Sequence, residues 1–135
     1  MSARKLWYLA APYTHKSRRE RAWRARQIDQ AAYQIMAQGL LVHSPISGGH
    51  AIEWGCAPLP HGRWMDLDRA VLWALHETRR LAGVILYRLP GWEGSAGVRE
   101  ELVLTGEEWG YVPLALDYGE DVAEWVARMR AERRI

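Results

Sequence analysis

The sequence has little or none of several residue types, and each shortage narrows the class of protein. Its single cysteine, Cys56, excludes an internal disulfide and suits a reducing cytoplasm, where we expect the protein to work. No apolar run approaches the about 18 residues that a membrane-spanning helix needs, so we expect no membrane partner. The first residues, Met-Ser-Ala-Arg-Lys, lead straight into a strand-like segment and do not resemble a signal peptide.

A large excess of one charge sign is also missing. The net charge of +2 is too small to predict nucleic-acid binding. With 135 residues, 49% of them hydrophobic and 25% charged, the chain is typical of one globular domain, which we assign to residues 1–135. Phenylalanine is absent, but there are eight tryptophans. One small core cannot easily bury so many, and aromatic residues are enriched at interfaces, so we expect a homo-oligomer, at least a dimer.

A zinc-binding pattern is absent too. His43, His50, Cys56 and His61 lie near one another in the chain, but their spacings match no common metal-binding motif. We therefore predict neither a metal site nor a cofactor.

Strand-like and helix-like segments alternate along the chain. Apolar runs predict strands at 6–11, 40–43, 84–87 and 112–116, and periodic patterns predict helices at 18–38, 64–80, 98–109 and 121–133. Ser17 and Gly39 are suitable caps for the first helix. The segment 44–61 is rich in glycine and proline and is predicted to be a long loop. The pattern indicates an α/β fold of flavodoxin-like or Rossmann-like type. We expect a parallel sheet of four to five strands flanked by helices, with the first strand between the second and the third.

The most informative segment is 90–101, which reads Pro-Gly-Trp-Glu-Gly-Ser-Ala-Gly-Val-Arg-Glu-Glu and follows the apolar run 83–87. It predicts a glycine-rich turn between a buried strand and a helix. Ligands of open α/β sheets bind at the carboxyl ends of the strands, and a helix N-terminus attracts anions. We therefore place the chemistry in this segment.

Three segments resemble the nucleoside 2-deoxyribosyltransferase superfamily. The first is Tyr8-Leu9-Ala10-Ala11-Pro12-Tyr13-Thr14, the second is His43-Ser44-Pro45-Ile46-Ser47, and the third is 89–101. The third closely resembles a small uncharacterised branch with the motif L-P-G-W-E-x-S-x-G followed by glutamate. The resemblance spans about the first 115 residues by the order of its motifs.

The resemblance implies a role for particular residues. Glu101, six residues after Ser95, would be the nucleophile, and Ser95 would hold the 5′ end of the sugar with the backbone amides of Gly97 and Val98. The branch also has Trp-x-x-x-Asp in its middle helix, matched by Trp64 and Asp68, so Asp68 would be the supporting acid. Asp66 lies nearby, and the sequence leaves open which of the two aspartates is in the site.

Other residues are expected around the substrate. Tyr13 would hydrogen-bond Glu101 or the sugar hydroxyls, and Pro12, Ser44 and Pro45 belong to the matching motifs at the strand ends. Serine at position 95, rather than aspartate, favours a nucleoside 5′-monophosphate over a free nucleoside. The residues expected to add positive charge for that phosphate are His15, Lys16, Arg18 and Arg19. Trp92 is either a core residue or a lid over the base.

The resemblance therefore implies a nucleotide N-glycosidase or deoxyribosyltransferase that needs no cofactor. Glycoside cleavage passes through an oxocarbenium-like state that a carboxylate can stabilise or attack. Two alternatives are a glycohydrolase of an NAD-like dinucleotide and a catalytically silent nucleotide-binding module. Without the motif, Glu101 would be interpreted as an exposed helix carboxylate beside Glu100, and Asp68 as an ordinary helix residue.

Overall fold

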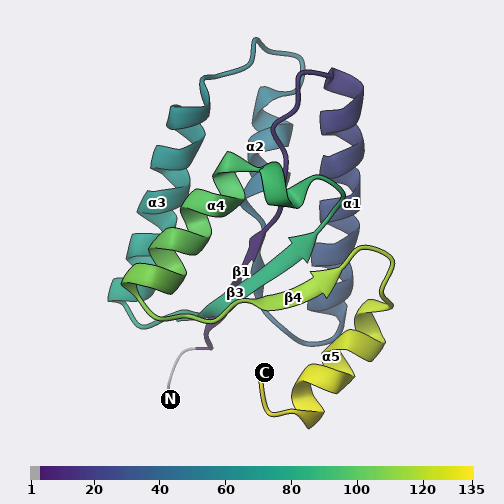
Figure 1. The fold of residues 1–135 in the computed structure, drawn as a ribbon, viewed down its shortest axis with the longest axis vertical. Coiled ribbons are helices and arrows are strands. Elements are labelled where there is room, and N and C mark those ends of the chain that lie inside the picture. Colours follow the sequence, from purple (N-terminus) through teal and green to yellow (C-terminus); the bar gives the residue numbers. More distant parts are fainter. Residues whose placement is uncertain (1–3) are drawn as a thin grey trace.

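Four parallel strands form the centre of the structure, a computed structural model that describes residues 4–135 (Figure 1). Their order in the sheet is β2-β1-β3-β4. The strands are β1 (Leu6–Ala10), β2 (Val42–His43), β3 (Leu81–Arg88) and β4 (Leu114–Asp117). The helices are α1 (Arg18–Ala37), α2 (Pro45–Glu53), α3 (His61–Glu77), α4 (Ala96–Leu102) and α5 (Val122–Ala131), with a 3₁₀ turn η1 (Trp92–Gly94) and a π-helix η2 (Val103–Glu108).

Helices cover both faces of the sheet, and successive residues of β1 point to opposite faces. Leu9 packs with Ile28 of α1 and Trp125 of α5 in one apolar cluster. Tyr8 packs with Leu72 of α3 and Val98 of α4 in the other. None of the helices within residues 4–135 is both long enough and apolar enough to cross a membrane.

The predicted fold class is confirmed. All strand pairs are parallel, and β1 lies between β2 and β3, as expected. Ser17 caps α1 by accepting a hydrogen bond from the backbone N–H of Glu20 (3.2 Å), and Gly39 follows the helix with φ +90°. The carboxyl ends of β1 and β3 therefore lie side by side, where a ligand site is expected in such a sheet.

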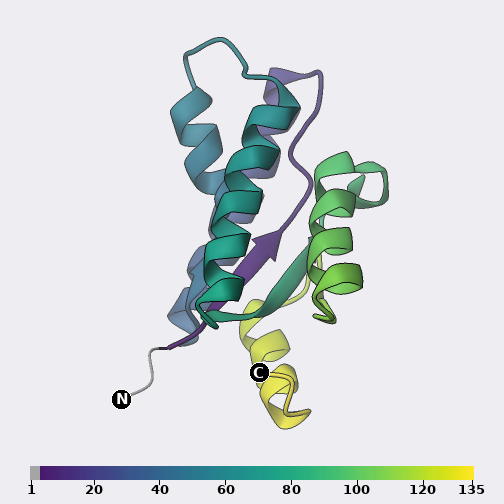
Figure 2. The same ribbon diagram turned by 90° about the vertical axis from the view of Figure 1, so that its left-hand side faces the viewer.

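The prediction of a continuous loop over 44–61 was wrong, because Pro45–Glu53 forms α2. Gly48 and Gly49 lower helix propensity, but Pro45 occupies the first helical turn, where its missing N–H costs nothing. The helix packs against α1, and the hydroxyl of Ser47 donates to Asp29 of that helix. Tertiary contacts thus override weak local propensity. Within 44–61 the irregular part is mainly the segment that joins α2 to α3, which crosses the top of the molecule on the side towards which β1 points (Figure 2).

The helix predicted at 98–109 starts earlier and changes type. It begins at Ala96, and after Leu102 its hydrogen bonding becomes that of a π-helix, η2. The hydroxyl of Thr105 donates to the backbone carbonyl of Glu101 (2.8 Å) at this change. Such π segments are frequent at functional sites.

Close packing of β1 against β3 requires a glycine. Trp7 pairs with Gly83, and a Cβ atom added at position 83 would lie 2.6 Å from the Trp7 ring. Gly83 therefore lets a large aromatic side chain lie against the neighbouring strand.

Candidate functional site

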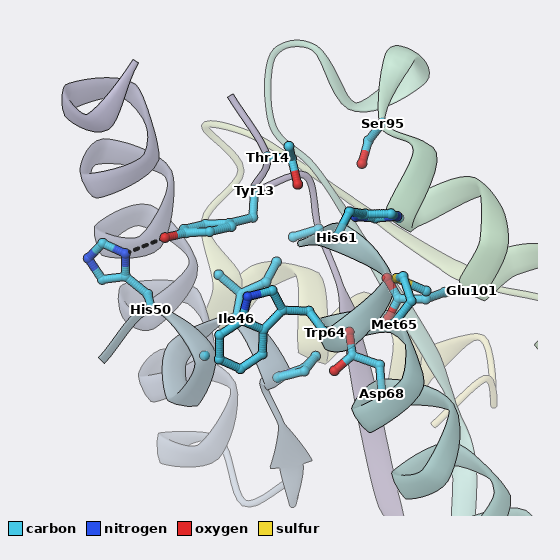
Figure 3. Close-up of a pocket in the computed structure, with 14 residues that line it drawn as sticks. Tyr13, Thr14, Ile46, His50, His61, Trp64, Met65, Asp68, Ser95 and Glu101 are labelled. Carbon is cyan, nitrogen blue, oxygen red and sulfur yellow. Dashed lines mark hydrogen bonds between the residues drawn. The ribbon is translucent and has the colours of Figure 1, made fainter. Parts of the chain in front are cut away.

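A pocket lies at the carboxyl ends of β1 and β3, enclosed by α2, α3 and α4 (Figure 3). It holds about 550 Å³ of empty space, part of it open to solvent. The residues that line it are Ala11, Tyr13, Thr14, Pro45, Ile46, Gly49, His50, His61, Trp64, Met65, Asp68, Ser95, Gly97 and Glu101. Six of the residues predicted from the sequence are among them: Glu101, Asp68, Tyr13, Ser95, Gly97 and Pro45.

Glu101 is the most unusual group of the pocket. Its residue is only 5% exposed, and its Oε2 atom has no hydrogen-bond partner among the described residues. Burial raises the pKa of this carboxyl to about 8, and the negative charges of Asp68 and Glu100 act in the same direction. Leaving such a buried oxygen unpaired costs free energy, so a group that donates a hydrogen bond to it would be stabilising.

The structure separates the two aspartates of α3. Asp68 lines the pocket, and burial raises its pKa to about 6, while nearby His61 lowers it. Asp66 lies at the surface with its side chain 78% exposed, and it pairs with Arg69 (3.8 Å). Asp68 is therefore the second acidic group that a ligand in the pocket can reach.

Tyr8 was not predicted as a site residue, yet it adjoins both carboxyls. It is fully buried in β1, and its hydroxyl lacks a hydrogen-bond partner of good geometry within residues 4–135. Burial and the charges of Glu101 and Asp68 raise the pKa of Tyr8 well above its usual range, so the phenol stays protonated. It is close enough to Glu101 to lower the pKa of that carboxyl. The sequence signal that could have identified Tyr8 was a tyrosine within a buried strand, because a buried tyrosine hydroxyl needs a hydrogen-bond partner.

Ser95 and Gly97 form the rim of the pocket that lies across from α2. The hydroxyl of Ser95 caps α4 by accepting from the N–H of Val98 (3.3 Å). A Cβ atom at Gly97 would lie 3.5 Å from the ring of His61, so glycine keeps this rim open. His61 supplies the imidazole nearest to Ser95 and Gly97 in the pocket lining.

Tyr13 points away from Glu101. Its hydroxyl hydrogen-bonds Nδ1 of His50 (2.7 Å), and the two rings meet edge to face (Figure 3). The structure therefore shows no hydrogen bond between Tyr13 and Glu101, one of the two partners predicted for Tyr13, and Tyr8 is the tyrosine whose hydroxyl lies close to that carboxyl. Tyr13, Trp64 and Ile46 make the part of the pocket between Glu101 and His50 aromatic and apolar.

Two helices present faces that sequence reasoning missed. His61, Trp64, Met65 and Asp68 follow the spacing i, i+3, i+4, i+7 along α3 and share one face of it. The same spacing relates Ile46, Gly49 and His50 along α2, but α2 was predicted to be a loop.

Several predicted site residues do not reach the pocket. The side chain of Val98 is buried in the core, and its backbone N–H donates a hydrogen bond to the hydroxyl of Ser95. Trp92 packs against the same core as a partly buried residue. Pro12 is buried behind the pocket wall, and the hydroxyl of Ser44 bonds that of Ser47 (2.8 Å).

The cationic residues expected beside Ser95 lie elsewhere. His15 accepts a hydrogen bond from the N–H of Ser17 (2.9 Å), and Lys16 and Arg19 are exposed outside the pocket. Arg18 stacks on Trp54, 4.2 Å from the ring centroid, beyond His50. The start of α1 therefore does not supply the phosphate-binding charge that the sequence suggested.

The pocket and its neighbourhood hold no cluster of metal ligands. Within residues 4–135, no three histidine, cysteine or acidic side chains lie close enough together to hold a metal ion. His50 is engaged by Tyr13, and His61 lies 3.4 Å from Glu100 at the surface.

A family profile described as a domain of unknown function, DUF1937, matches residues 5–108. The chain belongs to this family. The matched region runs from β1 to η2 and includes every residue that lines the pocket. No curated protein matches the chain.

The pocket offers three chemical functions. Two carboxyls with raised pKa values, Glu101 and Asp68, can share proton transfer and charge stabilisation near neutral pH. An aromatic section between Tyr13 and Trp64 can hold a flat ring. The rim at Ser95 and Gly97 offers a hydroxyl and small side chains for a polar group.

Proposed function

We propose that this protein cleaves the N-glycosidic bond of a nucleoside 5′-monophosphate, as a nucleotide N-glycosidase or a deoxyribosyltransferase. The observation that carries the proposal is Glu101, a buried carboxyl residue with an unpartnered oxygen, which lines the pocket together with a second carboxyl, Asp68. The aromatic section of the pocket can bind the flat ring of a base, and the rim at Ser95 can bind the 5′ end of the sugar. The resemblance in 89–101 points to the same chemistry.

The proposed reaction uses the two carboxyls in turn. The bond from C1′ to the base nitrogen breaks, its electron pair leaves with the base, and Asp68 donates a proton to that base. A carboxylate oxygen of Glu101 forms an ester bond to C1′. Water or a second base then attacks C1′, gives its proton to Asp68 and releases Glu101 as a carboxylate. Water yields hydrolysis, and a second base yields transfer.

The nucleophile must be ionised, whereas burial keeps Glu101 largely protonated at neutral pH in the empty pocket. A sugar hydroxyl that donates a hydrogen bond to the Glu101 carboxylate stabilises it and lowers its pKa. The Tyr8 hydroxyl acts in the same direction. Positive charge that develops on the sugar in the transition state stabilises the carboxylate further.

The 5′-phosphate is assigned to the rim formed by Ser95 and Gly97. A serine hydroxyl accepts and donates hydrogen bonds without repelling an anion, and the ring of His61 lies beside this rim. The carboxylates of Asp68 and Glu101 line the same pocket as Ser95.

A catalytically silent nucleotide-binding module is the second candidate, and one observation favours it. A carboxyl that is mostly neutral at pH 7 can donate a hydrogen bond to a ligand without attacking it. The two candidates differ in whether base is released.

We also propose that the protein forms a homo-oligomer in the cytoplasm. Trp54 and Trp73 are 53% and 48% exposed, and Trp73 belongs to an aromatic group with Trp109 and His76. Aromatic surface of this kind is common at protein interfaces. The exposed free thiol of Cys56 suits a reducing compartment.

Base release from a panel of nucleotides tests the function. The panel contains ribo- and deoxyribonucleoside 5′-monophosphates, the matching nucleosides and a nicotinamide dinucleotide, and chromatography measures the free base. Release from a monophosphate that Glu101→Gln abolishes supports the proposal. Binding of monophosphates without any release favours the silent module. Release from the dinucleotide alone contradicts the assigned substrate.

A further inference from the structure

A second pocket adjoins the first at the end that lies away from Glu101. It holds about 600 Å³ of empty space, part of it open to solvent, and it shares Tyr13 and His50 with the first pocket. In Figure 3 the Tyr13 ring extends from the centre of the first pocket towards His50, with Ser95 and Glu101 on the other side. The hydrogen-bonded pair of Tyr13 and His50 therefore forms a wall that the two pockets share.

The second pocket contains two arginines that no carboxylate neutralises. Arg18 and Arg21 line it, and neither has a carboxylate within 4.0 Å among the described residues. The Arg18 guanidinium stacks on Trp54, which holds it in place without neutralising its charge. Arg21 donates to the backbone carbonyl of His15. Both groups keep N–H donors available for a ligand.

The one carboxylate that lines the second pocket is already engaged. Oε2 of Glu53 accepts from the indole N–H of Trp64 (2.8 Å) and from the backbone N–H of Leu59 (3.2 Å). These bonds hold the joint between α2 and α3. Two arginines against one glutamate leave the pocket lining with a net positive charge, which favours an anionic ligand.

We infer that the second pocket binds an anionic substituent on the nucleobase, so that the substrate class is a nucleotide whose base carries a carboxylate-bearing side chain. This inference rests on the proposed function. With the sugar at Glu101 and its 5′ end at Ser95, the base lies along Tyr13 and Trp64, and a substituent on its far edge points towards His50. The second half of a dinucleotide extends from the 5′ end instead, away from Arg18 and Arg21.

A matched set of ligands tests the inference. We would compare three nucleoside monophosphates with the same base: one unsubstituted, one with a carboxyalkyl substituent and one with the isosteric carboxamide. Binding by calorimetry and base release would be measured for each. A charge-assisted hydrogen bond contributes enough to make the carboxylate bind about tenfold or more tightly than the carboxamide. Equal affinity for these two ligands overturns the inference.

Variants locate the effect. Arg18→Gln is the main variant, because its side chain is exposed and folding should tolerate the change. Arg19→Gln is the control. It removes the same charge from the neighbouring position, and Arg19 lines neither pocket. We expect Arg18→Gln to lose most of the carboxylate preference and Arg19→Gln to keep it. Equal losses in the two variants would show a general charge effect and overturn the inference.

Cys56 gives an independent readout, because the only cysteine of the chain lines the second pocket. The carboxyalkyl nucleotide should slow its reaction with a maleimide several-fold, whereas the unsubstituted nucleotide should not. Equal protection by both ligands contradicts the inference.

Failure of the inference and failure of the proposed function give different results. A carboxylate preference that needs Arg18, without base release from any ligand, keeps the second subsite and rejects the glycosidase. Base release from the unsubstituted nucleotide, with no gain from the carboxylate, rejects the subsite alone. Binding of a nicotinamide dinucleotide that depends on Arg18 also overturns the inference, because the arginines then hold a phosphate.

Discussion

Glu100 and Glu101 are neighbours in the chain, but their carboxylates lie in different surroundings. Glu100 accepts a hydrogen bond from Arg69 (3.0 Å) at the surface, whereas Glu101 is 5% exposed and lines the pocket. Successive residues of a helix differ by about 100° in direction, so only one of the pair can face the pocket. The two residues are therefore a matched pair for mutation.

Glu101→Gln should reduce base release by roughly a hundredfold or more, because it keeps the shape of the side chain and removes the nucleophilic oxygen. Glu100→Gln removes a surface charge one residue away and should leave turnover within about twofold, since Glu100 makes surface ion pairs and its charge affects the pKa of Glu101 less than burial does. Base release under single-turnover conditions measures both. Near wild-type turnover in Glu101→Gln would reject the mechanism.

The raised pKa of Glu101 predicts how stability depends on pH. The folded state holds this proton up to about pH 8, whereas the unfolded chain releases it near the ordinary value of 4.5. The folded state therefore binds more protons between these values, and the contribution of Glu101 to stability falls as pH rises through this window.

Glu101→Gln should remove this dependence. The thermal midpoint of the variant relative to wild type should rise between pH 5 and pH 8 by about 5 °C or more, since 1 kcal/mol shifts the midpoint of a domain of this size by roughly 3–6 °C. Glu100→Gln should show a nearly constant difference. A constant difference for Glu101→Gln would mean that its pKa is not raised.

Asp68→Asn should change the pH profile of base release as well as its rate. The active form has Asp68 protonated and Glu101 ionised. A plot of kcat/KM of the wild type against pH should therefore be bell-shaped, with its two apparent pKa values at about 6 and about 8. These values belong to the coupled pair of Asp68 and Glu101. Asp68→Asn leaves only the ionisation of Glu101, so the profile should become a single rise with pH. Asp66→Asn should keep the bell shape, because Asp66 is at the surface. An unchanged bell in Asp68→Asn would exclude Asp68 as the acid.

Ser95→Asp should reverse the preference for a 5′-phosphate. Aspartate caps a helix as well as serine does, so α4 should keep its start. Its charge repels a phosphate, and binding of the monophosphate should weaken by about tenfold or more, which corresponds to ~1.4 kcal/mol. Calorimetry with a monophosphate and its nucleoside tests this. Equal affinities of the wild type for the two ligands would contradict the assignment of the phosphate to this rim.

The mass in solution should be at least that of a dimer at micromolar concentration. The physical reason is the exposed aromatic surface around Trp73, which is favourable to bury against another subunit. Light scattering coupled to gel filtration measures the mass. A monomeric mass would reject the proposed oligomer.

Local patterns were sufficient for much of the fold. Alternating strand and helix segments predicted the parallel sheet. Because connections between parallel strands are short and right-handed, β1 was expected between β2 and β3, as the structure shows. The motif ending at Glu101 also pointed to the end of β3. These features depend on neighbours in the chain, so a single sequence is enough to reveal them.

Other features depended on contacts between distant segments. Packing against α1 stabilises α2 although Gly48 and Gly49 lower its helix propensity. At the start of α1, the side chain of Arg18 contacts Trp54 and does not lie beside Ser95. No local pattern records such contacts.

The sequence by itself therefore determined the order of the strands in the sheet and the segment that carries Glu101. Tertiary structure decided what surrounds that residue: Tyr8 comes from β1 and Asp68 from α3, and both meet Glu101 only when the helices pack on the sheet. The same packing removes water from the three groups, and this loss of solvation raises their pKa values. Burial is a property of the folded molecule, so the protonation state of the site could not be predicted from the order of residues alone.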